Sequence, residues 1–198
     1  MTKTERILVL RTIKHGESDL VVHGLNALGA RMNFFAKGAM KSRKRFAGGV
    51  LEATHYIDVT YRVGSSNEGD PLHMLQEATL IREFPKLRTD YDRLEAALYL
   101  LRLVSRMGQQ GVVDSPELFN LLGNALQAAE VSTHLENLKL QFELKLLANQ
   151  GVLPGHEAFT PWLRLGLAHH DQIQCEGADR HWLVAEAHSH LSQYLGTI

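Results

Sequence analysis

A run of basic residues with no acidic neighbour is the clearest chemical feature of this sequence. Between Ala30 and Glu52 there is no Asp or Glu. Lys and Arg attract phosphate groups whatever the base sequence, and aromatic rings offer surfaces on which unstacked bases can lie. The segment therefore indicates nucleic-acid binding. Its cations are Arg31, Lys37, Lys41, Arg43, Lys44 and Arg45, and its aromatic residues are Phe34, Phe35 and Phe46.

The same segment also fits a solvated basic hairpin that binds nothing. If residues 31–37 form a strand, neighbouring side chains face opposite sides, so at least one of Phe34 and Phe35 points into a core. Both interpretations stay open on the residues alone.

Motifs for covalent chemistry are missing from the sequence. It has no Gly-x-x-x-x-Gly-Lys-Ser/Thr phosphate loop, no Gly-x-Gly-x-x-Gly fingerprint and no His-Glu-x-x-His pair. Ser18 and Asp19 follow His15 within one tight turn, where a nucleophile and an orienting acid cannot flank the imidazole as a triad requires. No catalytic residue is predicted, and the protein is expected not to be an enzyme.

Histidines gather near the end of the chain, around the only cysteine, Cys175. A single thiol permits neither an intrachain disulfide nor a four-cysteine zinc site. His188 and His190 lie two apart on an expected helix and point about 200° from each other, so they cannot share one ion. His169, His170, Cys175 and His181 could in principle hold a metal, but their spacing matches no known zinc finger. No metal and no cofactor are predicted.

Composition places the chain among ordinary globular proteins. It has 198 residues, of which 44% are hydrophobic and 22% are charged, as expected for one large domain or two small ones. No apolar run approaches the roughly 20 residues of a membrane-spanning helix, and the first apolar run, residues 7–10, is too short for a signal peptide. The single cysteine favours a reducing cytoplasm.

Charge is distributed unevenly, although the net value is only −1. Residues 1–83 carry twelve Lys and Arg against nine Asp and Glu, and residues 84–198 carry nine against thirteen. This asymmetry hints at a nucleic-acid-binding part followed by a part with another task.

The elements that must position the basic segment change character after about residue 83. Alternating patterns predict five strands, at residues 6–14, 20–25, 31–37, 51–62 and 72–81, which suggests a small barrel or sandwich. Apolar residues then recur at helical spacing from Thr89 onward. Ser115 with Pro116 is expected to start a second helix, Thr133 with Glu136 forms a predicted capping box for a third, and a last helix is expected at residues 180–195.

Particular motifs resemble those of a known family. Residues 10–22, which include the turn Gly16-Glu17-Ser18, precede Gly29, the strand end Phe35-Ala36-Lys37-Gly38-Ala39 and the basic pair Ser42-Arg43. This order resembles the N-terminal part of the RecO family of bacterial DNA repair proteins. Residues 142–147 followed by Gly151-Val152-Leu153-Pro154 resemble the long central helix of that family and the turn after it. The resemblance covers roughly residues 6–154.

The resemblance implies an α+β protein: a five-stranded OB-fold barrel at residues 1–83, followed by an all-helical domain at residues 84–151. It implies a recombination mediator that binds single- and double-stranded DNA and anneals complementary strands. With RecR, such a protein helps to load RecA onto single-stranded DNA coated by SSB, in the cytoplasm and at the nucleoid during repair. The basic positions that match the family are Arg11, Lys14, Lys37 and Arg43, while Arg31, Lys41, Lys44 and Arg45 extend the same surface by composition.

The family also implies a docking site for the acidic SSB tail on the helical part, with an apolar pocket and a basic rim. Candidate rim residues are Arg93, Arg102, Arg106, Lys139 and Lys145. Many members carry a four-cysteine zinc module after the Gly-x-x-Pro turn, which this chain cannot form. Residues 152–198 are expected to replace it with a metal-free helical cap that packs on the helical domain.

Two other functions remain as alternatives. An RNA-binding or translation-associated OB-fold module would need the same electrostatics. A metal-dependent hydrolase would need the C-terminal histidines.

Overall fold

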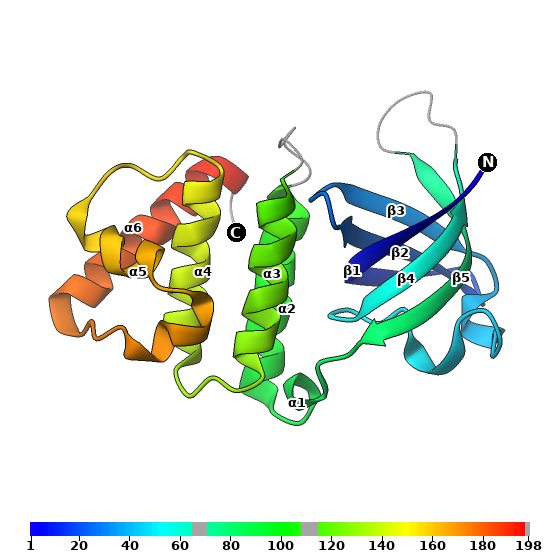
Figure 1. The fold of residues 1–198 in the computed structure, drawn as a ribbon, viewed down its shortest axis with the longest axis horizontal. Helices are drawn as coiled ribbons and strands as arrows, with labels where there is room; N and C mark the ends of the chain where they lie inside the picture. The colour runs from blue at the N-terminus through cyan, green and yellow to red at the C-terminus, as the bar shows by residue number, and fades with distance from the viewer. Residues whose placement is uncertain (65–70, 108–114, 197–198) are drawn as a thin grey trace. The chain divides into compact units, whose positions relative to one another are not determined.

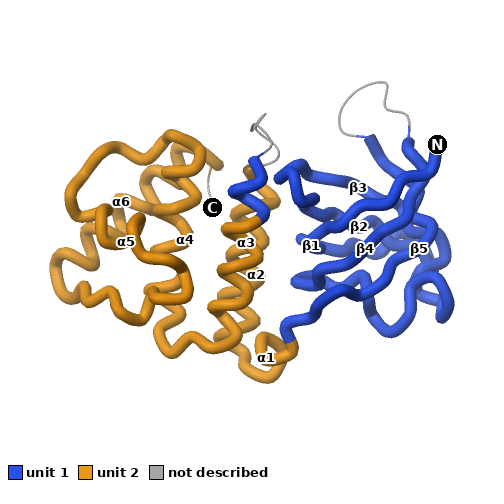
Figure 2. The backbone as a smooth tube through the Cα atoms, viewed as in Figure 1, with its two compact units in different colours: residues 1–84, 114–119 blue, residues 85–113, 120–198 orange. Residues whose placement is uncertain are grey.

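The structure is a computed structural model, which describes residues 1–64, 71–107 and 115–196. It consists of a five-stranded barrel followed by helices (Figure 1), so the predicted fold class is confirmed. The chain divides into two compact units, Met1–Phe84 with Asp114–Phe119 and Pro85–Val113 with Asn120–Ile198 (Figure 2).

The barrel is closed in the order β1-β2-β3-β5-β4. Strand β1 pairs with both β2 and β4, and its register shifts between Val9 and Arg11. Such a bulge bends a strand, which lets β1 close the barrel. The parallel pairing of β3 with β5 completes the ring. The strands are β1 (Thr2–His15), β2 (Asp19–Asn26), β3 (Arg31–Ala36), β4 (Tyr56–Arg62) and β5 (Leu72–Arg82).

The barrel interior is filled by side chains from all five strands and from the segment between β3 and β4. Ile7, Val22 and Phe34 are completely buried. Gly24 of β2 faces Ile7 so closely that an added Cβ would lie 2.6 Å from the Ile7 side chain. The position therefore needs glycine, because the backbone of β2 packs directly on the core. The other members of this core are Val9, Ala36, Ala39, Phe46, Val50, Leu51, Ile57, Val59, Tyr61, Leu75 and Ala78.

The predicted strand at residues 51–62 is wrong in its first half. β4 begins only at Tyr56, and residues 50–55 form turns. Val50 and Leu51 are adjacent and both buried, which an alternating strand does not permit. Thr54 has a φ of 77° and donates its backbone N–H to the Val9 carbonyl at 3.0 Å. The chain has to turn into the barrel here, and the alternating pattern does not reveal that turn.

Four long helices follow the barrel in the described part of the chain, and the first residues of α3 belong to the barrel unit. Asp90 accepts hydrogen bonds from the backbone N–H groups of Asp92 and Arg93 at 3.0 and 3.1 Å, so it caps α2. Pro116 is the first residue of α3, as predicted. The helices are α1 (Pro85–Arg88), α2 (Tyr91–Met107), α3 (Pro116–Ala129), α4 (Leu135–Asn149), α5 (Thr160–Arg164) and α6 (Gly177–Leu195).

The predicted capping box of α4 is wrong. The helix begins at Leu135 with His134 as N-cap, and no side chain caps it. Thr133 instead contacts the His134 ring, with 3.0 Å between Oγ1 and Nδ1. A capping box needs Ser or Thr at the N-cap and Glu or Gln three residues later. Here His134 is the N-cap, so Thr133 precedes it and Glu136 follows it by only two residues.

The C-terminal segment packs on α4 around a second apolar core. The buried residues of α6 recur every four positions, at Leu183, Ala187, Leu191 and Leu195. Trp162 of α5 is 1% exposed and shares a cluster with Leu140 and Leu144 of α4. Trp182 of α6 lies at the edge of this core, because it is 40% exposed and stacks on Phe159 with ring centroids 5.8 Å apart.

Candidate nucleic-acid interface

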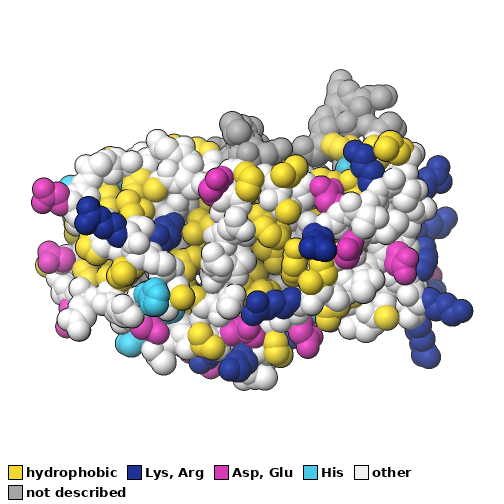
Figure 3. Space-filling model, viewed as in Figure 1, with side chains coloured by type: hydrophobic (Ala, Val, Ile, Leu, Met, Phe, Trp, Pro, Cys, Tyr) yellow, Lys and Arg dark blue, Asp and Glu magenta, His cyan; other side chains and the backbone are white. Residues whose placement is uncertain are grey.

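The basic segment forms a loop on the barrel unit, between β3 and β4. It contains two short 3-10 helices, η1 (Ala39–Lys41) and η2 (Ala47–Gly49). Lys and Arg side chains gather along one margin of this unit (Figure 3). We call the side chains of Lys37, Lys41, Arg43 and Lys44, all of which are exposed, the basic loop cations.

Backbone hydrogen bonds attach this loop to the turn between β1 and β2. The N–H of Gly38 donates to the Asp19 carboxylate at 2.7 Å, and the N–H of Met40 donates to the Ser18 carbonyl at 2.9 Å. Gly38 has a φ of 66°, a conformation that glycine adopts without strain. The turn that resembles the family motif thus supports the start of the loop.

Arg45 has a structural role within the loop. Its guanidinium donates to the Lys37 carbonyl at 2.8 Å and lies over the Phe46 ring, 5.1 Å from the centroid. Its carbonyl accepts from the N–H of Ala78 on β5 at 3.0 Å. These contacts fix the backbone of the loop, so less backbone entropy is lost when its cations bind a ligand.

Two of the three aromatic residues of the segment are unavailable to bases. Phe34 and Phe46 lie in the barrel core at 0% and 5% exposure, so the stacking role offered by the sequence is wrong for them. They are buried because Phe34 faces the barrel interior and the loop folds Phe46 over the barrel end. Phe35 faces outward, half-buried, with the His15 ring edge-on at 5.5 Å.

The remaining predicted cations of this unit lie on different parts of the barrel. Arg11 is exposed on the outside of β1, opposite His23 of β2. Lys14 is exposed near the end of β1, opposite Leu20. Arg31 is half-buried at the start of β3. The structure therefore brings Lys37, Lys41, Arg43, Lys44 and Arg45 into one loop and places Arg11, Lys14 and Arg31 on the strands.

A chain of polar side chains crosses the outside of the barrel beside Arg11. His23 Nε2 lies 3.4 Å from a guanidinium nitrogen of Arg11, and His23 Nδ1 lies 2.6 Å from the Asn33 side-chain oxygen. Burial lowers the pKa of His23, with Arg11 and Arg31 as further causes. The sequence analysis did not single out His23 and Asn33. The alternation of β2 and β3 nevertheless places their side chains on the outer face of the barrel, with those of Val21 and Phe35.

Two of the cations predicted to form a partner site on the helical unit, Arg93 and Lys139, have partners within the protein. The Arg93 guanidinium donates to the Glu130 carbonyl. Lys139 Nζ donates to Glu95 at 2.7 Å and to Glu136 at 3.1 Å. Burial opposes the charged ammonium, but these hydrogen bonds raise the pKa of Lys139 overall.

The other three candidates differ in exposure. Lys145 is half-buried, donates to the Leu163 carbonyl at 2.6 Å, and has its pKa lowered by burial. Arg102 is exposed and lies over the Tyr99 ring, 5.8 Å from the centroid. Arg106 is half-buried in the last turn of α2.

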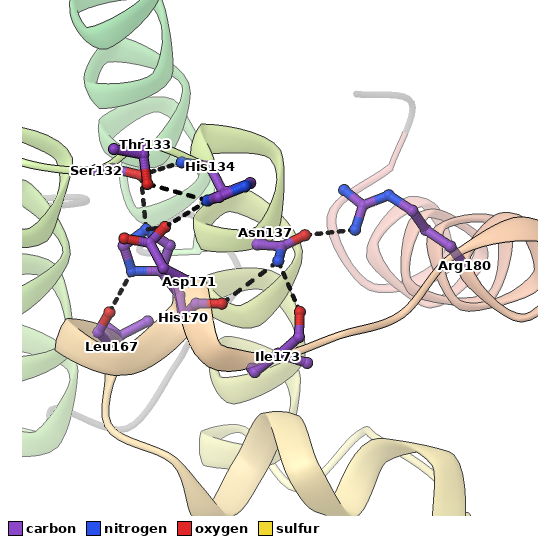
Figure 4. Close-up of polar contacts among 9 residues, drawn as sticks. All are labelled: Ser132, Thr133, His134, Asn137, Leu167, His170, Asp171, Ile173 and Arg180. Atoms are coloured by element: carbon purple, nitrogen blue, oxygen red, sulfur yellow. Dashed lines mark hydrogen bonds and ion pairs between the residues drawn. The ribbon is translucent and has the colours of Figure 1, made fainter.

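One of the histidines near the C-terminus, His170, takes part in a polar network that joins η4 (Leu167–Gln172) to the start of α4 (Figure 4). His170 is 2% exposed, and its Nε2 lies 2.6 Å from Ser132 Oγ and 2.9 Å from the Asp171 carboxylate. Its Nδ1 lies 2.6 Å from the Leu167 carbonyl. A serine triad needs the acid on the nitrogen opposite the serine, so this arrangement is a structural connection.

The same network continues along α4. Asn137 donates its side-chain N–H to the carbonyls of His170 and Ile173, and it accepts from Arg180 of α6 at 2.5 Å. In the part of the chain that the structure describes, no three His, Cys, Asp or Glu residues are grouped so that they could hold a metal ion. No helix among the described residues is long and apolar enough to cross a membrane.

Comparisons with known proteins match both parts of the chain to one family. Residues 1–84 match the family described as "Recombination protein O N terminal", and residues 88–156 match "Recombination protein O C terminal". The chain is 35% identical over 156 residues to DNA repair protein RecO of Syntrophobacter fumaroxidans, which covers 79% of this chain and 59% of that protein.

Two further relatives show the same pattern. Identity is 31% over 159 residues to DNA repair protein RecO of Maridesulfovibrio salexigens, covering 78% of this chain and 61% of the relative. For the protein of the same name from Syntrophus aciditrophicus, identity is 34%, with 77% and 56% covered. The chain thus spans about three-fifths of the length of these relatives, and the matches to both halves show that it belongs to the RecO family of DNA repair proteins.

Proposed function

We propose that this chain binds single- and double-stranded DNA through the basic loop and anneals complementary strands during DNA repair. The observation that carries the proposal is the loop itself: four exposed cations, on a segment without acidic residues, held in one shape by Arg45 and by the β1–β2 turn. Annealing requires two phosphate backbones to approach each other, and a dense group of cations reduces their repulsion. Covalent chemistry has no part in this activity, so we propose a mediator and not an enzyme.

The family supports further partners for this proposal. With RecR, the protein would help to load RecA onto single-stranded DNA coated by SSB, a process of the cytoplasm and the nucleoid. For the acidic SSB tail, we propose the helical unit around Arg102, whose guanidinium is exposed beside Tyr99. Lys139, Lys145 and Arg93 support the helical unit through internal contacts and would contribute less to that site.

The test of DNA binding is a salt titration of affinity with a variant of the basic loop. Lys41→Ala/Arg43→Ala/Lys44→Ala removes three exposed cations and leaves the Arg45 anchor in place. For single strands, the log-log salt slope should become shallower by about 2, because each lost phosphate contact accounts for roughly 0.7. An unchanged slope in the folded variant would contradict the proposal.

Three further assays address the finer claims. Competition between matched DNA and RNA oligomers separates a repair protein from an RNA-binding module, and we expect DNA to compete at least as well. Annealing of short complementary strands should slow in the loop variant. A fluorescent SSB-tail peptide should bind the wild type at low salt, and Arg102→Ala should weaken that binding; a peptide that fails to bind would refute this partner site.

A further inference from the structure

One cavity of the helical unit is lined by both carboxylates and apolar side chains. It has a volume of about 450 Å³ and lies between α2, α4 and α6. Leu140 of α4 and Val184 of α6 form part of its apolar wall, and the carboxylates of Glu136 and Glu143 on α4 line it as well. We call this space the helical cavity.

Glu143 places a buried carboxylate in the wall of the helical cavity, and the residue is 3% exposed. Among the described residues, its carboxylate accepts a hydrogen bond from the Tyr99 hydroxyl at 2.5 Å and lies 3.6 Å from Nε2 of His188. The hydroxyl is neutral, and an imidazole is positive only when it is protonated. Because a buried charge is costly unless it is paired, a cation that enters the cavity would be held strongly at Glu143.

A second negative charge lies at the other end of α4. Glu95 and Glu136 share one cation, because Lys139 donates to Glu95 at 2.7 Å and to Glu136 at 3.1 Å. Two carboxylates and one ammonium group leave one negative charge. The Glu136 side chain is 74% exposed, so its oxygens can accept hydrogen bonds from a ligand as well as from Lys139.

An apolar stretch separates these two negative charges. Glu136 and Glu143 are seven residues apart in the sequence of α4, which is almost two turns. They therefore lie on one face of the helix, roughly 10 Å apart along its axis. Leu140 lies between them on that face, and Val184 lines the cavity from α6. The order along the cavity is carboxylate, apolar wall, carboxylate.

We propose that the helical cavity binds a polyamine, a chain of methylene groups with ammonium groups at its ends. One ammonium group pairs with Glu143 and another with Glu136, while the methylene groups cover Leu140 and Val184. This ligand matches both the charge of the cavity and its apolar wall. It is bound independently of DNA, so the proposal goes beyond the function proposed above.

The aromatic ring and the absence of a metal cluster favour the same class of ligand. Lys139 Nζ lies 5.9 Å from the centroid of the Tyr99 ring, and ammonium groups are attracted to aromatic faces. Mg²⁺ keeps several of its water ligands when it binds, so it gains nothing from an apolar wall. Within the described residues, no three His, Cys, Asp or Glu side chains are placed to hold a metal ion.

The experiment is a calorimetric titration of the full chain with spermidine at low salt and without DNA. Glu143→Gln removes the buried charge but keeps the size of the side chain, and Asp179→Asn removes an exposed acid of α6 outside the cavity. Ser192→Lys introduces an ammonium group at an exposed position that lines the cavity. Its control is Gln193→Lys, which adds the same charge at the next, also exposed position of α6.

Spermidine should bind the wild type, and Glu143→Gln should weaken binding about 10-fold or more, as the loss of a hydrogen-bonded charge pair does. Ser192→Lys should weaken it to a similar extent, because its own ammonium group occupies the cavity. Both controls should stay within about 2-fold of the wild type. n-Butylamine, which has one charge, should bind at least about 10-fold more weakly than spermidine, and Mg²⁺ at equal concentration should not displace spermidine.

The pH dependence of spermidine binding provides a readout that a structural role of Glu143 would not change. Protonated His188 competes for the Glu143 carboxylate, so affinity should rise between about pH 5.5 and pH 8 in the wild type and much less in His188→Gln. Spermidine stays charged over this range, as lysine does. The titratable groups around the carboxylate are Glu95 and Tyr99 of α2, Glu136 and Lys139 of α4, and His188 of α6.

Several outcomes would overturn the proposal, and none of them concerns DNA binding. If Glu143→Gln weakens spermidine binding no more than Asp179→Asn does, the attraction is diffuse and not located in the cavity. If Ser192→Lys and Gln193→Lys have equal effects, the added charge acts at a distance. If Mg²⁺ displaces spermidine at equal concentration, the apolar wall contributes nothing. If the wild type binds no spermidine, the cavity is not a polyamine site.

Discussion

The cations of the basic loop and those of the helical unit differ in whether they bind other groups of the protein. The basic loop cations are exposed on a segment without acids, whereas the guanidinium of Arg45 in the same loop donates to the Lys37 carbonyl. In the helical unit, Lys139 lies between two glutamates and Lys145 donates to a carbonyl. The basic loop cations therefore remain available to a ligand, whereas Lys139 and Lys145 are held by contacts within the helical unit.

The comparison predicts a large effect on stability from the helical cations and none on DNA binding. Arg93→Ala/Lys139→Ala/Lys145→Ala should lower the free energy of unfolding by about 3–5 kcal/mol, since hydrogen bonds to charged groups contribute roughly 1.5–3 kcal/mol each and the exposed part of the Lys139 pairs contributes less. Urea unfolding measures the loss. The basic loop variant is the matched control, because surface substitutions usually stay within about 0.5 kcal/mol per site. Equal losses in both variants would remove the distinction between the two units.

Within the basic loop, Arg45 is anchored to the protein and Arg43 is not, so the two should respond differently to substitution. Arg45→Ala should lower the free energy of unfolding by about 1–2 kcal/mol, because it removes the hydrogen bond to the Lys37 carbonyl and the contact with the Phe46 ring. DNA affinity should fall further than one lost charge explains, because the loop cations would no longer be held in one shape. Arg43→Ala removes one exposed charge without an anchor and serves as the control. If both variants behave alike, Arg45 is an ordinary surface cation.

The pKa values of two barrel histidines are lowered, whereas that of one histidine in the helical unit is raised. Burial lowers the pKa values of His23 and His73 in the barrel. The hydrogen bond to the buried Glu143 raises the pKa of His188 on α6 above the ordinary 6.5, with the charge of Glu136 adding to it. The folded helical unit therefore holds a proton more tightly than the unfolded chain does, and the folded barrel holds it less tightly.

A pH series should separate these two responses. The stabilisation from protonated His188 is fully present below its unfolded pKa and is lost as the pH rises through the raised folded value. His188→Gln should therefore cost stability at about pH 5.5 and almost none at about pH 8.5. Hydrogen exchange of the α6 backbone amides measures this change in local stability. For His23 and His73 the sign is reversed, so the barrel amides should lose protection as the pH falls below about 6.5. A pH-independent effect of His188→Gln would show that the Glu143 contact carries no charge.

Much of this fold could be predicted because its patterns are local. Alternation placed the five strands, and Pro116 marked the start of α3. The starts of β4 and α4 could not be predicted, because each depends on a turn whose backbone shape is set by tertiary contacts. The apparent capping pair Thr133 and Glu136 belongs to such a turn.

The site was predictable to a different extent. Charge composition identified the basic loop cations, since charge is visible in the sequence whatever the fold. The inward position of Phe46 and the anchoring by Arg45 were not predictable, because both follow from how the loop closes over the barrel end. The closure of the barrel by the parallel pair β3 and β5 was not predictable either, because the alternation within a single strand does not contain the register between strands.

The smallest expected effect concerns Thr54, at the barrel end near the basic loop. Among the described residues, Thr54 is the one non-glycine residue with a positive φ, and its buried hydroxyl has no hydrogen-bond partner.

The left-handed conformation costs roughly 1–2 kcal/mol for an L-residue with a Cβ, which Thr54→Gly removes. Loss of the buried methyl group, about 0.8 kcal/mol, and the greater freedom of glycine in the unfolded chain offset part of this gain. Thr54→Gly should therefore raise the free energy of unfolding by about 0.5 kcal/mol, whereas Thr54→Ala, which keeps the Cβ, should not. Urea unfolding compares the two variants. DNA affinity should not change, because the Thr54 side chain is buried. Destabilisation by Thr54→Gly greater than that by Thr54→Ala would show that the side chain, and not the backbone strain, determines the stability of this turn.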